Sequence, residues 1–147
     1  MEENILVEWD DRYLVGIGLI DEQHKELIAL TNTLYQACLE GDAKAKTHFM
    51  EAIHSTVDYV RYHFSAEEKL LESVNYPDLA EHKKQHEGFV LQIFEEVKSF
   101  EQGKKFVPNV FVRYLKDWIL THIALADKKY AQYILHLKKE GLLQLEL

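Results

Sequence analysis

The sequence contains a single cysteine among its 147 residues, and only two prolines and six glycines. One cysteine, Cys38, cannot form a disulfide within the chain and cannot build a cysteine-based zinc or iron–sulfur site. The scarcity of proline indicates helices, because a chain of short strands needs frequent turns. Since 47% of the residues are hydrophobic, global disorder is excluded as well.

The chain also has little positive charge and no long apolar run. Lys plus Arg number 17 and Asp plus Glu 25, a net charge of -8, so we expect no nucleic-acid binding and no attraction to a membrane. The longest apolar stretch, about residues 13–20, is interrupted by glycines and is too short to span a bilayer. The N-terminus lacks the basic start and apolar core of a signal peptide. We therefore expect a cytoplasmic protein with a single domain over residues 1–147.

Apolar residues recur every three to four positions along most of the chain, which is the period of an amphipathic helix. In the first such segment the residues on one side are Leu27, Leu30, Leu34 and Cys38, and Asp21 is the expected N-cap. We predict an all-α fold, an up-down-up-down antiparallel four-helix bundle, because short connections join antiparallel neighbours. The predicted parts are an N-terminal arm (residues 1–20), the bundle (21–127, with helices at about 21–40, 43–74, 79–101 and from 108) and a short C-terminal fifth helix with a tail (128–147).

Eight histidines stand out in this composition, and two of them are four residues apart. His82 and His86 lie one helical turn apart, within about 40° of each other around the axis, which suits a metal ion. His63 and Glu67 repeat the spacing with a carboxylate as the second member. Taken alone, each pair is more typical of a helix surface, as two solvated histidines or as an ion pair.

The heights of these residues in the predicted bundle favour a shared site. At about 1.5 Å rise per residue, Glu67 and His86 both lie about 12 Å from the turn at residues 75–78. By the same measure, His24 on the first helix and His122 on the fourth fall in this layer, so that every helix of the bundle contributes a histidine. The remaining three histidines fall outside the layer or face away from it, and we expect them to be solvated or hydrogen-bonded without a metal: His48, His54 and His136.

Asp127 follows His122 by five residues, a spacing that turns it about 140° away in an ideal α-helix. Two interpretations remain open from the spacing alone. A local π-bulge, or an approach from the helix edge, would bring the carboxylate to the metal. Alternatively, Asp127 caps the Lys-rich helical segment that follows.

At these positions the sequence resembles the hemerythrin family, most closely its single-domain bacterial form, over nearly the whole chain. The resemblance is carried by Ile20-Asp21-Glu22-Gln23-His24, by His63-Phe64 with Glu67-Glu68, by Tyr76-Pro77 before His82 and His86, and by Trp118 with His122 and Asp127-Lys128-Lys129-Tyr130. It implies two iron ions in a di-iron centre with an oxo or hydroxo bridge. It assigns one iron to His82, His86 and His122, the other to His24 and His63, and gives the bridging role to Glu67 and Asp127.

The resemblance further implies that dioxygen binds reversibly at the iron held by two histidines, in a pocket walled by Leu27, Phe64, Trp118 and Leu125. Apolar walls keep water and protons from such a site, which slows its autoxidation. A histidine-rich set also differs from the carboxylate-dominated sets of di-iron oxidases. We therefore expect oxygen storage, transport or delivery and no enzyme activity.

Three other functions remain open at this stage. One is oxygen or redox sensing through a separate partner protein. Another is a di-iron enzyme, with a peroxidase, nitric-oxide or iron-handling role. The third is a mononuclear zinc or structural metal site, which would leave three of the seven ligands unused.

Overall fold

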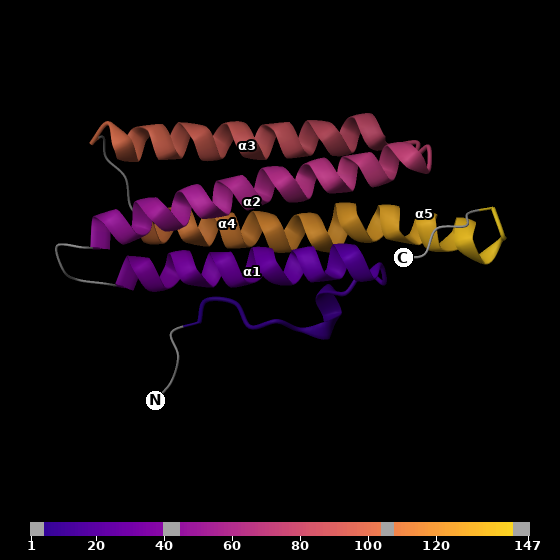
Figure 1. Cartoon of the computed structure of the whole chain (residues 1–147), viewed down its shortest axis with the longest axis horizontal. Coiled ribbons are helices and arrows are strands. Elements are labelled where there is room, and N and C mark those ends of the chain that lie inside the picture. The colour runs from indigo at the N-terminus through magenta and orange to yellow at the C-terminus, as the bar shows by residue number, and fades with distance from the viewer. Residues whose placement is uncertain (1–4, 40–44, 104–107, 143–147) are drawn as a thin grey trace.

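The computed structural model describes residues 5–39, 45–103 and 108–142, and these residues form helices with no strand among them. Four long helices, α1 (Gly18–Leu39), α2 (Ala45–Ser73), α3 (Leu79–Glu101) and α4 (Pro108–His122), run side by side in alternating directions (Figure 1). A short 3-10 turn, η1 (Asp11–Tyr13), precedes α1. The predicted four-helix bundle is confirmed. Residues 1–4 of the predicted arm and 143–147 of the predicted tail lie outside the described residues.

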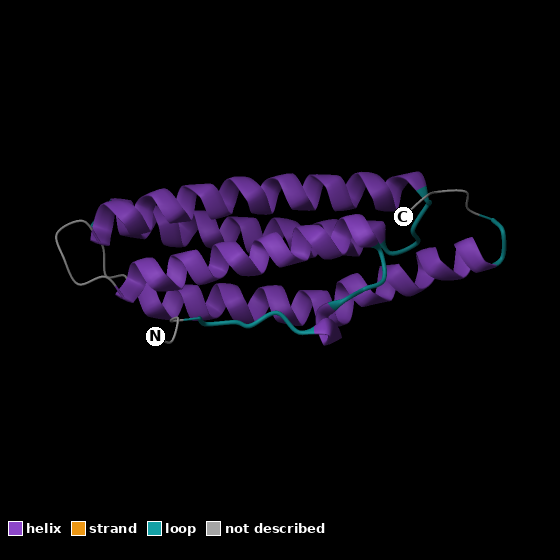
Figure 2. Ribbon diagram, turned by 60° about the horizontal axis from the view of Figure 1, so that its bottom comes forward, coloured by secondary structure: helices purple, strands orange, loops and turns teal. Residues whose placement is uncertain are grey.

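The fourth helix continues beyond the bundle instead of ending in a loop. A π-helical segment, η2 (Ile123–Asp127), leads directly from α4 into α5 (Lys128–Lys139). Figure 2 shows α5 extending the line of α4 past the ends of the neighbouring helices. The predicted fifth helix is therefore present, as an extension of the fourth.

The inner faces of the helices form one hydrophobic core. Its fully buried members come from every long helix and include Leu34, Ile53, Ile93 and Leu115. Burying one such side chain contributes about 1.5–3 kcal/mol. At the end of the bundle where α1 and α3 begin, buried polar side chains replace this apolar packing. Within the described residues, no helix is both long and apolar enough to cross a membrane.

A tight turn between α2 and α3 is held in place by α5. Asn75 adopts a left-handed conformation (φ 54°), as is common just after the end of a helix, and the backbone N–H of Tyr76 donates to the carbonyl of Leu71 (3.0 Å). The hydroxyl of Tyr133, on α5, donates to the carbonyl of Val74 (2.9 Å). The turn predicted at residues 75–78 is present, and it fixes the heights of α2 and α3 relative to each other.

The start of α1 differs from the prediction, because the helix begins at Gly18, three residues before Asp21. Asp21 is therefore in the first turn, where its N–H donates to the carbonyl of Ile17 (2.8 Å). Its buried carboxylate accepts hydrogen bonds from the backbone N–H groups of Val15 (2.7 Å) and Gly16 (3.2 Å). Gly16 has a φ of +91°, a backbone conformation in which a residue with a side chain would be strained. Asp21 thus ties the N-terminal arm to α1.

We expect Asp21→Ala to lower the free energy of unfolding by about 1–3 kcal/mol, because it leaves two backbone donors of the arm without their acceptor. Urea denaturation of the protein without added metal measures this loss. Glu22→Ala is the matched control, since the Glu22 side chain is 74% exposed and its removal should change stability by about 0.5 kcal/mol or less. Equal effects of the two substitutions would show that Asp21 contributes no more than a surface charge.

Candidate metal centre

Seven buried polar side chains meet between the helices, and they are the seven that the sequence predicts as metal ligands. None is more than 7% exposed. The spacing within each helix explains the meeting, since residues four apart share one helix face. They are His24 on α1, His63 and Glu67 on α2, His82 and His86 on α3, His122 at the end of α4, and Asp127 in η2.

These side chains form two groups that share both carboxylates. In each group, one ligand atom from every residue lies within 4.8 Å of the others. The larger group contains three histidines and the smaller group two. Glu67 and Asp127 belong to both groups, which is the arrangement that two neighbouring metal ions with bridging carboxylates require. The larger group is His82, His86 and His122 with the carboxylates, and the smaller is His24 and His63 with the same carboxylates.

Glu67 directs one carboxylate oxygen to each group. Its Oε1 lies 2.6 Å from Nε2 of His82 and 3.1 Å from Nε2 of His86. Its Oε2 lies 3.2 Å from Nε2 of His63 and 3.8 Å from Nε2 of His24. The side chain is fully buried, and it stands between the two groups.

Asp127 likewise directs one carboxylate oxygen to each group. Its Oδ1 lies 3.3 Å from Nε2 of His82 and 3.2 Å from Nε2 of His122, and its Oδ2 lies 2.9 Å from Nε2 of His24. The π-helical geometry of η2 explains this position, because hydrogen bonds between residues five apart bring such residues to one face. Asp127 makes no capping hydrogen bond to α5. Of the two interpretations of its spacing, the π-bulge is therefore the one observed.

Two further side chains orient two of these histidines by accepting hydrogen bonds from Nδ1, the ring nitrogen that faces away from the cluster. The Nδ1–H of His63 donates to Oε1 of Gln23 (2.6 Å), and the Nδ1–H of His86 donates to Oε2 of Glu68 (2.7 Å). Such bonds fix the ring and leave Nε2 free to face a metal.

Tyr130, on α5, supports the carboxylate in the same manner. Its buried hydroxyl donates to Oε2 of Glu67 (2.9 Å). Sequence reasoning assigned no role to Tyr130, Gln23 or Glu68. The only available signal was their proximity in sequence to predicted ligands, and proximity in sequence does not say where a side chain points.

The site contains buried polar atoms that a metal ion would satisfy. Nε2 of His24 and Oδ1 of Asp127 approach neighbouring ligand atoms to 2.9 and 3.2 Å but make no hydrogen bond of suitable geometry within the described part of the chain, although buried polar atoms are normally paired. Both atoms lie in the cluster of ligand atoms. Imidazole and carboxylate are ligands that suit iron. The residues present therefore fit a pair of metal ions.

The charges of the cluster are consistent with this fit. Burial opposes a charged imidazole, but the carboxylates of Asp127 and Glu67 outweigh it and raise the pKa of His24 and of His82 to about 9. Burial likewise opposes a charged Glu67, but the surrounding histidines hold the pKa of its carboxyl well below the usual value. Protons on histidine thus balance the buried anions when no metal does, and a metal ion takes over that role by displacing them.

A small cavity adjoins the two-histidine group. It measures about 10 Å³ and is lined by both histidines of that group, His24 and His63, by His122 and Asp127, and by apolar side chains. A volume of this size holds about one water-sized molecule. The predicted pocket residues Leu27, Phe64 and Trp118 all line this cavity, together with Val60, Phe89, Ile119 and Ile123.

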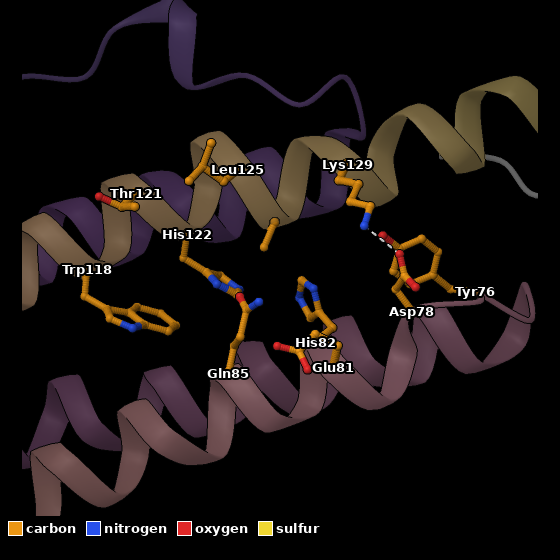
Figure 3. Close-up of a pocket in the computed structure, with 11 residues that line it drawn as sticks. Tyr76, Asp78, Glu81, His82, Gln85, Trp118, Thr121, His122, Leu125 and Lys129 are labelled. Carbon is orange, nitrogen blue, oxygen red and sulfur yellow. Dashed lines mark ion pairs between the residues drawn. The ribbon is translucent and has the colours of Figure 1, made fainter.

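Leu125, which was expected to wall the oxygen pocket, does not line this cavity. Its side chain is 70% exposed and borders an outer pocket of about 320 Å³ on the α3–α4 side. In Figure 3 it points away from His82 and Gln85. In a regular α-helix Leu125 would lie within about 60° of the face of His122, but the π-helical segment holds more residues per turn and carries Leu125 to the outside.

Ile119 and Ile123 line the cavity, the position in which Leu125 was expected. They are 4% and 2% exposed. Ile119 lies three residues before His122, a spacing that puts the two on one helix face. This signal was available from the sequence on the N-terminal side of His122, where the helix is regular.

Comparison with known sequences defines the class. The family profile described as Hemerythrin HHE cation binding domain matches residues 15–134, a range that includes all seven clustered side chains. The chain belongs to the hemerythrin family.

Individual relatives agree with this assignment. A bacteriohemerythrin of Stenotrophomonas maltophilia is 33% identical over 129 residues, which cover 88% of this chain and 82% of the relative. A hemerythrin-like protein of Naegleria gruberi is 34% identical over 122 residues, covering 83% of this chain and 88% of the relative. Among solved structures, a wild-type hemerythrin superposes with a TM-score of 0.80 at 28% identity, covering 86% of this chain and 96% of that one.

Proposed function

We propose that this protein holds two iron ions and binds dioxygen reversibly, for storage, transport or delivery, without catalysing a reaction. The observation that carries the proposal is the division of both carboxylates between two groups of histidines. One iron would be held by His82, His86 and His122, the other by His24 and His63, and both by the carboxylates. The similarity to bacteriohemerythrins supports the same assignment.

The two positions differ in the number of ligands that the chain offers. Three histidines and two carboxylates serve one iron, whereas two histidines and the same carboxylates serve the other. Both histidines of the position with fewer ligands, His24 and His63, line the cavity, whereas the three-histidine group contributes His122 to the lining. When bound, an iron pair supplies electrons that dioxygen can accept and return. The chain therefore leaves room for dioxygen on one side of the centre.

The side chains around the cavity control what else can enter. Leu27 and Phe64 are 3% and 6% exposed, and the Trp118 indole stacks on Phe89 (3.8 Å between ring centroids). These packed apolar groups exclude water and proton donors, and slow proton entry favours release of dioxygen over its reduction.

Metal analysis with optical spectra tests the proposal. We expect two irons per chain, with visible charge-transfer bands that appear under oxygen, vanish under vacuum and return through repeated cycles. The same protein loaded with zinc is the control, because a d¹⁰ ion gives no such bands.

Two results would contradict the proposal. A single zinc ion and no visible band would favour a structural metal site. Two irons that oxidise irreversibly at every exposure to oxygen would favour a di-iron enzyme.

A further inference from the structure

The two groups of metal ligands differ in the charge of the side chain that accepts a hydrogen bond from Nδ1 of a ligand histidine. In the three-histidine group, the Nδ1–H of His86 donates to a carboxylate, that of Glu68, at 2.7 Å. In the two-histidine group, the Nδ1–H of His63 donates to a neutral amide, that of Gln23, at 2.6 Å. The two bonds have nearly the same length, so the contrast lies in charge and not in geometry.

The surroundings of each partner match its charge. Glu68 is 26% exposed in its side chain and borders a surface cleft of about 470 Å³, where water reaches it. Gln23 is only 5% exposed, and an anion in its place would lose most of its hydration. The fold thus accommodates a charge behind one group and disfavours it behind the other.

The ring that connects Glu68 to the centre is held rigidly. The imidazole of His86 stacks on Phe64, with 3.7 Å between ring centroids and 2° between the planes. Its Nε2 faces the cluster, 3.1 Å from Oε1 of Glu67. The charge of Glu68 therefore acts on the centre through a fixed ring, with no freedom to turn away.

We propose that Glu68 is a positioning residue that makes the two metal positions electronically unequal. This inference rests on the proposed two-iron function. A carboxylate on Nδ1 makes the imidazole a more basic, more electron-donating ligand, and its negative charge favours the higher charge state of a nearby metal. The iron held by His82, His86 and His122 is therefore the first to lose an electron. The iron beside the cavity would keep its electron longer.

The test withdraws electrons one at a time in the absence of oxygen. The fully reduced, iron-loaded protein is titrated with ferricyanide, which accepts one electron per molecule, and the two midpoint potentials are measured. For the unaltered chain we expect two separate steps and an electron paramagnetic resonance signal from the half-oxidised protein. In Glu68→Gln the first step should move to higher potential and the gap between the steps should narrow.

Two further variants separate charge from structure. Glu68→Asp keeps the charge and should preserve most of the gap. Glu87→Gln removes the same charge from the same cleft and should shift both steps slightly and together. Iron content and thermal unfolding, measured on every variant, report any structural damage.

The inference is overturned if Glu68→Gln shifts both steps only as Glu87→Gln does. It is equally overturned if Glu68→Gln lowers iron content without moving the potentials of the iron that remains. Because the titration uses no oxygen, a failure of reversible oxygen binding leaves these potentials measurable. An iron content below two in the unaltered chain contradicts the proposed function itself, and is read before any titration.

Discussion

Glu67→Ala should abolish the binding of both iron ions. The reason is that Glu67 directs Oε1 to the three-histidine group and Oε2 to the two-histidine group, so neither position keeps its full set of ligands. The substitution also deprives the buried hydroxyl of Tyr130 of its acceptor. Since metal binding stabilises only the folded state, the loss of each ion removes about 2.7 kcal/mol when free metal is at about 100 times its dissociation constant.

Metal analysis after iron loading and desalting measures the first effect, and thermal unfolding with and without iron measures the second. Glu72→Ala is the matched control: it removes an exposed carboxylate from the same helix and should leave two irons bound. His122→Ala should lose iron and stability as well, because His122 belongs to the larger group. Full iron occupancy in Glu67→Ala would contradict the assignment of this carboxylate as a shared ligand.

In Ile119→Ala, the oxygen-bound protein should oxidise irreversibly at least about tenfold faster. A tenfold faster rate corresponds to an activation barrier lower by about 1.4 kcal/mol. Ile119 is 4% exposed and lines the cavity. Shortening it enlarges a space that now holds about one water-sized molecule, so that water and protons reach the centre. The substitution also costs about 2–5 kcal/mol of stability, so Ile119→Val, which enlarges the cavity less, is measured beside it.

Leu125→Ala is the control for this experiment. It removes the same class of side chain a short distance along the chain, but from a position that is 70% exposed, and the rate should not change. The decay of the oxygen-dependent visible bands gives the rate for each protein. An equal acceleration in Leu125→Ala and Ile119→Ala would show that the cavity is not where water is excluded.

The meeting of the seven side chains was predictable because the rise of a helix is nearly invariant. Counting residues from each turn brings one histidine or more from every helix of the bundle into a common layer, namely His24, His63, His86 and His122. The same geometry predicted which histidines lie elsewhere, and His48, His54 and His136 are all exposed. His54 lies beside Glu101, 3.7 Å away, at the other end of the bundle.

What escaped prediction depends on deviations from regular helices and on distances between them. The i,i+5 spacing of Asp127 allowed two interpretations, and the π-helical segment that selects one of them also turns Leu125 outward. The carboxylate of Asp21 was free to cap a helix or to bind the arm, since nothing in the sequence sets where α1 begins. The roles of Gln23 and Glu68 depend on how closely α1, α2 and α3 approach one another.

The π-helical segment constrains the number of residues between the ligand cluster and α5. In a regular α-helix, Asp127 would point about 140° away from His122, and the buried face of α5 would be turned with it. The wider turn of the segment reorients both the Asp127 side chain and the buried face of α5 toward the interior of the bundle. Asp127 therefore reaches the cluster, and Tyr130 and Ile134 are buried in the core. It therefore behaves as an insertion that the helix has absorbed. Metal binding and the packing of α5 share one register, and neither can change its spacing without moving the other.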